Sequence, residues 1–340
     1  MPNKKTMHNT KVTAILIAMF LITQLIGLFV IHTYHVNGNP LPFGMEPPEE
    51  IDNPQGAGFL GTLLTAFIFV ILIFFLLTRI KAARFIRAWF FLVTVLAIGL
   101  TFKAISFSTF GKDILLSSIL PIQLNISFIS LIIILLALPL AYIKIFKRDP
   151  IIHNLTELVI YPGIAAVFVP ILGILGIIIL LLIISLYDIW AVWKSQFMEK
   201  MAKYQINNLK IFTGFFIPYA DKKQKAKIKL IKQKSLKLKD KNRGKFLEKQ
   251  FKKSKIKVNL AILGGGDVIF PMIAAGIFYV VMGLIPALII IASSTLGLLG
   301  LFMLARKGKF YPAMPFLTIA IYLGIVVIYF LRDILKLSSF

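Results

Sequence analysis

Long apolar stretches dominate this 340-residue sequence and restrict the folds it can adopt. A helix that crosses about 30 Å of hydrocarbon, at 1.5 Å per residue, needs about 20 apolar residues. Nine stretches reach that length: 12–32, 58–78, 86–107, 123–145, 152–171, 173–193, 259–281, 283–305 and 312–333. Hydrophobic residues make up 58% of the chain and charged residues only 15%, which excludes an ordinary soluble domain. The sequence therefore predicts an all-α polytopic membrane protein with nine transmembrane helices.

Positive charge is concentrated in one segment of the chain. There are 38 Lys and Arg residues against 14 Asp and Glu, and residues 194–257 hold 21 of the basic and 4 of the acidic ones. We therefore predict helices 1–6 in residues 1–193, a long basic loop over 194–257, and helices 7–9 in 258–340. With the N-terminus in the cytoplasm, 34 of the 38 basic residues fall on the cytoplasmic side, as the positive-inside rule requires. The C-terminus is then extracytoplasmic.

The basic loop and the absence of cysteine both limit the partners and the kinds of site that the chain can have. A polybasic loop at the cytoplasmic surface is attracted to anionic lipid headgroups, and this interpretation is preferred to nucleic-acid binding because the positive-inside rule already expects the charge there. A chain without cysteine has no disulfide, thiolate nucleophile or zinc–thiolate site. The four histidines, His8, His32, His35 and His153, are scattered. We expect no metal and no cofactor.

Two aspartates lie inside apolar stretches, Asp188 in the sixth and Asp267 in the seventh. An aspartate within a membrane helix costs on the order of 2.5–3.5 kcal/mol on insertion scales, so each needs a compensating role. Asp188 precedes Lys194 by six residues and Asp267 follows Lys257 by ten. These offsets correspond to about 9 and 15 Å of helix. Both carboxyls are therefore expected in the cytoplasmic half of the bilayer, where they meet if the two helices are neighbours.

Two facing carboxyls permit a specific chemistry. They cannot both ionise cheaply and so share one proton. One then activates water as a general base while the other polarises or protonates a carbonyl, as in an aspartic protease. Two alternatives remain open at this point: a buried aspartate with a purely structural hydrogen bond, and a proton or cation relay in a transporter.

Glycine and proline flank the second aspartate. Gly264, Gly265 and Gly266 remove side chains where another backbone must approach and weaken the helix. Pro271 has no N–H to bond the carbonyl of Asp267. We therefore expect the seventh helix to be weakened on both sides of this carboxyl. In the eighth stretch, Gly297 and Gly300 are predicted to be close-packing positions.

Three motifs occur in order on the sixth, seventh and ninth predicted helices: Tyr187-Asp188, Gly264-Gly265-Gly266-Asp267 and Pro312-Ala313-Met314. Together they resemble the YD, GxGD and PAL motifs of the presenilin and signal peptide peptidase family of intramembrane aspartyl proteases, most closely its archaeal branch. The resemblance covers essentially the whole chain and implies a presenilin-like fold with Asp188 and Asp267 as the catalytic pair. Met314 replaces the family's leucine, a mild change of shape.

The resemblance implies an intramembrane aspartic endopeptidase that uses water as the nucleophile and cuts transmembrane segments of membrane proteins. The presenilin orientation predicts substrates with their N-terminus outside. We expect an integral protein of a prokaryotic, archaeal cell membrane. It contacts lipids, can form a homo-oligomer and has no nucleic-acid partner. The alternative is a proton- or cation-coupled transporter that uses the same aspartates, which predicts inverted repeats. A prepilin-peptidase-like enzyme fits less well, because it would have fewer helices and no PAL-like motif.

Two segments near the basic loop have strand character, Ile211–Tyr219 and Lys255–Leu260. A substrate helix must unwind before it is cut, and an exposed sheet edge can hold the unwound part by strand addition. Candidate substrate contacts are Phe215, Ile217, Ile256 and Val258. Residues 211–219 could instead lie at the membrane interface, anchored by their aromatic rings. Glu157, near the start of the fifth helix, is expected to favour that helix's dipole.

Overall fold

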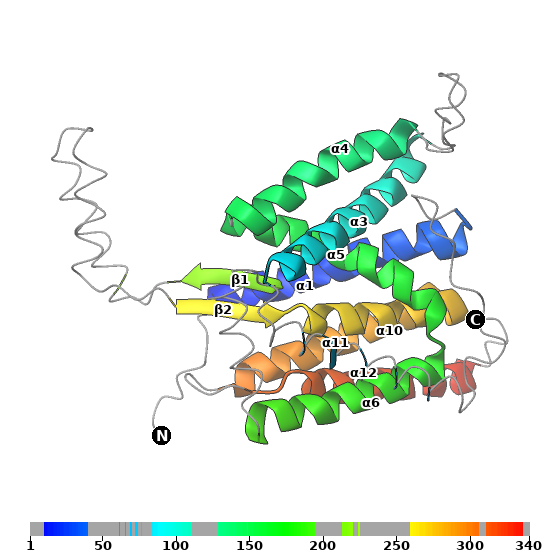
Figure 1. Ribbon diagram of the computed structural model, residues 1–340. Coiled ribbons are helices and arrows are strands. Elements are labelled where there is room, and N and C mark those ends of the chain that lie inside the picture. The colour runs from blue at the N-terminus through cyan, green and yellow to red at the C-terminus, as the bar shows by residue number, and fades with distance from the viewer. Residues whose placement is uncertain are drawn as a thin grey trace. The chain divides into compact units, whose positions relative to one another are not determined.

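The computed structural model describes residues 10–39, 83–110, 128–147, 149–194, 213–219, 259–305 and 311–335, with isolated positions between them. Within these residues the fold consists of helices and one short two-stranded sheet (Figure 1). The chain forms two compact units. One comprises Met1–Phe215 with Gly264–Phe340, and the other comprises Phe216–Leu263.

The helices and strands follow the apolar stretches of the sequence, and several helices end in a wider or tighter turn. The elements are α1 (Thr10–Ile31) with η1 (His32–Val36), α3 (Ala83–Phe110), α4 (Phe128–Tyr142) with η4 (Ile143–Lys147), α5 (Pro150–Phe168) with η5 (Val169–Ile171), α6 (Ile174–Ile189) with η6 (Trp190–Lys194), β1 (Gly214–Tyr219), β2 (Asn259–Gly264), α10 (Gly266–Met282), α11 (Leu284–Leu304) and α12 (Met314–Leu335).

Seven of the described helices are long and apolar enough to cross a membrane, and α10 is a shorter apolar helix. Large apolar side chains point out of the bundle, among them Leu135, Leu296 and Val326, which are more than 60% exposed. Such an apolar outer surface suits lipid as the surrounding solvent. The chain is therefore an all-α membrane protein with about seven candidate transmembrane helices. The helix expected at 58–78 lies outside the described residues, apart from isolated positions.

The start of the seventh predicted helix is wrong. Residues Asn259–Gly264 form β2, which pairs with β1, and the helix begins only at Gly266. An apolar run does not by itself distinguish strand from helix, and glycine is a poor helix former, so the chain changes conformation at the glycine motif. The predicted strand within 211–219 is confirmed as β1. Of the strand expected at 255–260, the last two residues form the start of β2, and 255–258 lie outside the described residues.

Helix α10 lies at the centre of the bundle and contacts α1, α5, α6, α11 and α12. Small buried residues allow this close packing, since Ala274 and Ala275 are fully buried. At Gly276 an added Cβ would lie 2.6 Å from a side-chain carbon of Ile31 and 2.7 Å from one of Val169, too close for van der Waals contact. A side chain at this position would displace Ile31 and Val169, so glycine lets α10 pack closely against both α1 and η5.

Helix α12 packs beside α11 and α6, as Figure 1 shows. Two hydroxyl groups of α12 are satisfied by backbone carbonyls of α6. The Tyr322 hydroxyl donates to the carbonyl of Ile178 at 2.6 Å, and Thr318 Oγ1 donates to the carbonyl of Leu181 at 3.3 Å. Hydrogen bonds between membrane helices hold polar groups that lipid cannot satisfy. They also fix the first half of α12 against the first half of α6.

Candidate active site

Asp188 lies in the last turn of α6 and is buried, with 4% of its surface exposed. Its Oδ2 accepts a hydrogen bond of 3.1 Å from the backbone N–H of Met314, the first residue of α12. The backbone of Ala313 also bonds this carboxyl. The first N–H groups of a helix have no partner within the helix, and the dipole there favours an anion. The Asp188 carboxyl therefore occupies the N-terminus of a neighbouring helix.

The Pro312-Ala313-Met314 motif supplies these donors. The predicted ninth helix began at Pro312, but α12 begins at Met314, so Pro312 and Ala313 lie in the segment that leads into it. Pro312 and Met314 are buried, which places the motif inside the bundle rather than at its surface. Tyr187, the neighbour of Asp188, turns its ring toward Trp190, with centroids 6.2 Å apart.

Asp267 lies in the first turn of α10, directly after the glycine motif. A Cβ added to Gly264 would lie 3.0 Å from Asp267 Oδ2, and a Cβ added to Gly265 would lie 3.0 Å from the Tyr161 hydroxyl. These distances are tight for any side chain. At Gly266 the nearest atom would be 3.5 Å away, in the Phe270 ring, which is ordinary contact. Close approach therefore constrains the first two glycines most.

The two carboxyls belong to helices that contact each other, α6 and α10. Asp188 is near enough to act electrostatically on Asp267, and the backbone of Gly264 bonds the Asp267 carboxyl. Two carboxyls that interact in an apolar bundle cannot both ionise cheaply, and such a pair can activate a water molecule. This is the arrangement that the sequence predicts for helices 6 and 7.

The structure describes two of the four residues predicted to contact the substrate. Phe215 is fully buried, and its ring packs edge-on against Tyr161, with centroids 5.5 Å apart at 88°. This side chain is a core contact. Ile217 is half-buried in β1. Ile256 and Val258 lie outside the described residues.

Sequence reasoning missed a buried polar cluster on α5 and η4. Glu157 does not serve the helix dipole as predicted, because it lies beyond the first turn of α5. It is 1% exposed and forms an ion pair of 2.9 Å with Lys144. Asp149 caps the helix instead, since its Oδ1 accepts from the N–H groups of Ile151 and Ile152 at 2.9 and 3.1 Å. Ionisable residues repeated within an apolar helix were the available signal.

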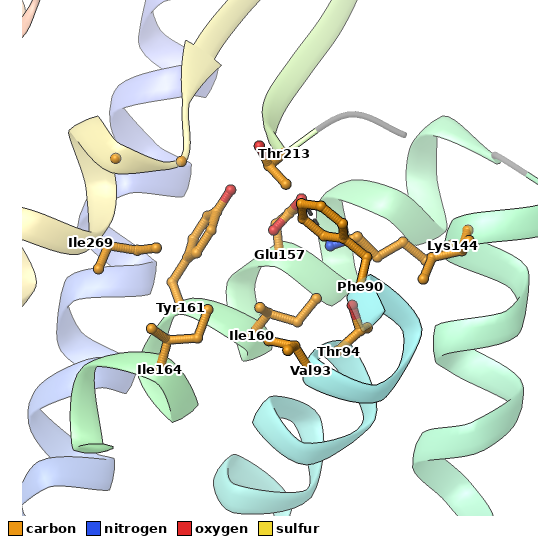
Figure 2. Close-up of a pocket in the computed structure, with 13 residues that line it drawn as sticks. Phe90, Val93, Thr94, Lys144, Glu157, Ile160, Tyr161, Ile164, Thr213 and Ile269 are labelled. Carbon is orange, nitrogen blue, oxygen red and sulfur yellow. Dashed lines mark ion pairs between the residues drawn. The ribbon is translucent and has the colours of Figure 1, made fainter. Parts of the chain in front are cut away.

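A cavity of about 220 Å³ adjoins this cluster and the glycine motif. Figure 2 shows the Tyr161 hydroxyl and the Lys144–Glu157 pair at its wall. Gly265 and Gly266 line the cavity on the side of α10, and Phe90 and Thr94 line it on the side of α3. The cavity therefore joins the polar cluster to the residues that precede Asp267. Among the described residues, no group of three or more His, Asp or Glu side chains could hold a metal ion.

A family model described as "Signal-peptide peptidase, presenilin aspartyl protease" matches residues 17–333. No curated protein matches the chain significantly. Two solved structures, both of a presenilin family intramembrane aspartate protease in space groups C222 and P2, are 20% identical to the chain over 93% of its length. The matches cover 97% and 96% of those chains, with TM-scores of 0.54 and 0.53.

Proposed function

The chain belongs to the signal-peptide peptidase and presenilin family of aspartyl proteases, and we propose that Asp188 and Asp267 are the catalytic carboxyls of this intramembrane protease. The observation that carries the proposal is the hydrogen bond from the Met314 N–H to Asp188. It joins the YD motif to the PAL-like motif, while Asp267 enters from the adjacent α10. The family match favours proteolysis over the transporter alternative.

The mechanism that follows uses the two carboxyls as a pair. One carboxylate takes a proton from water, which attacks the scissile carbonyl, and the other carboxyl protonates the oxygen that becomes negative. Collapse of the tetrahedral intermediate expels the amine, which takes a proton from the pair. Because the titration belongs to the pair, neither aspartate is assigned a fixed role. The backbone N–H groups of Ala313 and Met314 hold Asp188 in place throughout.

The substrates of this family are membrane proteins, and the charge pattern sets their expected direction. We propose nine transmembrane helices, a cytoplasmic N-terminus and an extracytoplasmic C-terminus, because 34 of 38 basic residues then lie in the cytoplasm. Substrates then have their N-terminus outside. Substrates inserted in both directions in sealed vesicles test this: preferential cutting of the N-terminus-inside form contradicts it.

An unwound substrate needs a partner for its backbone N–H and C=O groups. The β1–β2 sheet supplies a candidate edge, and β2 runs directly into the glycine motif before Asp267. We propose that substrate adds to this sheet as a strand. Backbone atoms of β1 and β2 then make the main contacts, while Phe215 supports β1 from within the core.

The dyad is tested by Asp188→Asn and Asp267→Asn on a single-span substrate in liposomes. Each change keeps the side chain's shape and removes its acid–base function, so we expect cleavage to fall by at least about 100-fold. Asp149→Asn is the matched control, because it is an exposed helix cap and should retain activity. Normal cleavage by either dyad variant would refute the assignment. Proton or cation flux without proteolysis would support the transporter.

A further inference from the structure

Three polar side chains on α5 share one face of the helix. His153, Glu157 and Tyr161 are spaced by four residues, so they stack one above another. They are 4%, 1% and 2% exposed respectively. Polar groups buried within a membrane helix are costly and mark function by default.

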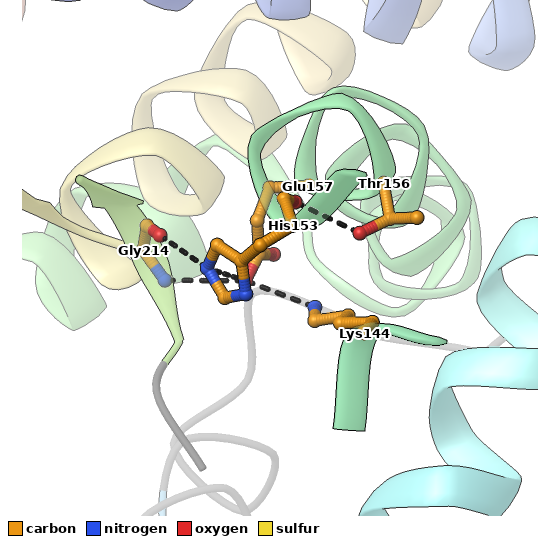
Figure 3. Close-up of polar contacts among 5 residues, drawn as sticks. All are labelled: Lys144, His153, Thr156, Glu157 and Gly214. Carbon is orange, nitrogen blue, oxygen red and sulfur yellow. Dashed lines mark hydrogen bonds and ion pairs between the residues drawn. The ribbon is translucent and has the colours of Figure 1, made fainter. Parts of the chain in front are cut away.

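The first two residues hold one glycine from both sides, as Figure 3 shows. His153 Nε2 donates to the carbonyl of Gly214 at 2.9 Å, and the N–H of Gly214 donates to Glu157 Oε1 at 3.3 Å. Gly214 is the first residue of β1 and has φ of 134°, a conformation that favours glycine. Both hydrogen-bonding groups of this residue are therefore fixed at the point where β1 begins.

Lys144 makes this arrangement possible. Its Nζ lies 2.9 Å from Glu157 Oε1, and both side chains are almost fully buried. His153 Nε2 is 3.4 Å from the same oxygen. A buried carboxylate without a partner would be strongly unfavourable. The lysine balances its charge, and Glu157 can remain an acceptor for the Gly214 N–H.

The third residue of the face connects β1 to the glycine motif. The Tyr161 ring packs edge-on against Phe215, the second residue of β1. Its hydroxyl lies against Gly265, where an added Cβ would be only 3.0 Å away. Gly265 precedes Asp267 by two residues. One face of α5 therefore contacts both the start of β1 and the backbone that leads into the proposed catalytic carboxyl.

We propose that His153, Glu157 and Tyr161 form a positioning spine that holds Gly214 and Phe215 at a fixed place against Gly265, and so sets the register of a substrate strand that pairs with β1. This inference rests on the proposed function. A one-residue slip of a paired strand exchanges the faces of all its side chains and moves the scissile bond. The spine residues act through the backbone and are positioning residues.

The test measures where a single-span substrate is cut, by mass spectrometry of both products, together with KM and kcat. His153→Leu removes the donor to the Gly214 carbonyl. We expect additional cut positions one or two residues away and a KM raised about 2- to 10-fold, the range for one lost hydrogen bond. Glu157→Gln leaves Lys144 unbalanced and should disturb the register further. Lys144→Met combined with Glu157→Gln restores neutrality, keeps an acceptor for Gly214 and should recover a single cut position.

Thr156→Val is the matched control. Thr156 is a buried neighbour on α5, and its hydroxyl donates within the helix, to the carbonyl of His153 at 2.8 Å. It should lower thermal stability to a similar extent and leave the cut position unchanged. Unchanged cut positions and KM in the His153 and Glu157 variants, with cleavage lost in Asp188→Asn, would overturn the spine and leave the proposed function standing. Cleavage that persists in Asp188→Asn would overturn both.

Discussion

Two glycines of α11, both predicted to pack closely, differ in their surroundings. A Cβ added to Gly297 would lie 2.6 Å from the Cβ of Ala320 and 3.0 Å from the carbonyl oxygen of Phe316, both on α12. A Cβ added to Gly300 meets no atom of the described residues within 4 Å. The prediction is thus confirmed for Gly297 and wrong for Gly300. Alanine substitution at each position should therefore have opposite effects on stability.

The expected change in stability is the sum of two contributions, overpacking and helix propensity. Carbon atoms pack favourably at about 3.5–4.0 Å, so Gly297→Ala must separate α11 from α12 by about 1 Å. Overpacking of this kind costs about 1–3 kcal/mol. Replacing glycine by alanine within a helix contributes about 0.5–1 kcal/mol of stability at either position. Gly300→Ala should therefore stabilise the fold by about 0.5–1 kcal/mol, and the two variants should differ by about 1–3 kcal/mol.

The displacement also reaches the proposed site. Phe316 follows Met314 by two residues, and the Met314 N–H bonds Asp188. A shift of the first turn of α12 by about 1 Å would misplace this carboxyl, and misplacements of that size cost up to about 100-fold in rate. Gly297→Ala should lower kcat by about 10- to 100-fold, whereas Gly300→Ala should leave it unchanged.

Thermal unfolding in detergent and cleavage of a single-span substrate provide the two measurements. Gly297→Ala combined with Ala320→Gly removes the shorter contact and should recover much of both stability and kcat. If Gly297→Ala unfolds at the same temperature as Gly300→Ala and retains kcat, then α11 and α12 do not meet at this glycine, and the reasoning is refuted.

Substitutions at two further positions test a helix cap and a bond between helices by thermal unfolding. Asp149→Ala removes the cap of α5 and should cost about 1 kcal/mol, whereas Asp149→Ser should retain most of that stability; equal loss in both would contradict the cap. Tyr322→Phe removes the hydrogen bond to the Ile178 carbonyl and should lower the stability of the fold by about 0.5–1.5 kcal/mol. An unchanged unfolding temperature would show that this bond between α12 and α6 contributes nothing.

The helices and the proposed dyad could be predicted because their signals are local. A bilayer requires about 20 apolar residues per helix, and such stretches are visible without knowledge of packing. An acidic residue within one is rare enough to attract attention by itself. Asp188 and Asp267 were therefore identifiable before any contact between α6 and α10 was known.

The contacts of the α5 cluster were not predictable because its partners lie elsewhere in the chain. His153 and Glu157 stand one turn apart in an apolar stretch, but only the fold brings Lys144 and Gly214 to the Glu157 carboxylate. The position of β2 was missed for another reason. Residues 259–264 are as apolar as a helix requires, and only their pairing with β1 selects the strand.

Both proposed catalytic carboxyls lie where a helix begins, Asp188 against the start of α12 and Asp267 in the first turn of α10. A carboxylate within a membrane needs donors. Backbone N–H groups lack helical partners in the first turn of a helix and in the residues just before it, where Met314 lies for Asp188 and Gly264 for Asp267. A helix therefore begins inside the bundle at each position. Gly264–Gly266 and Pro312–Ala313 suit such beginnings, since neither segment readily continues a helix from the preceding side. The breaks before α10 and α12 therefore identify the site as much as the aspartates do.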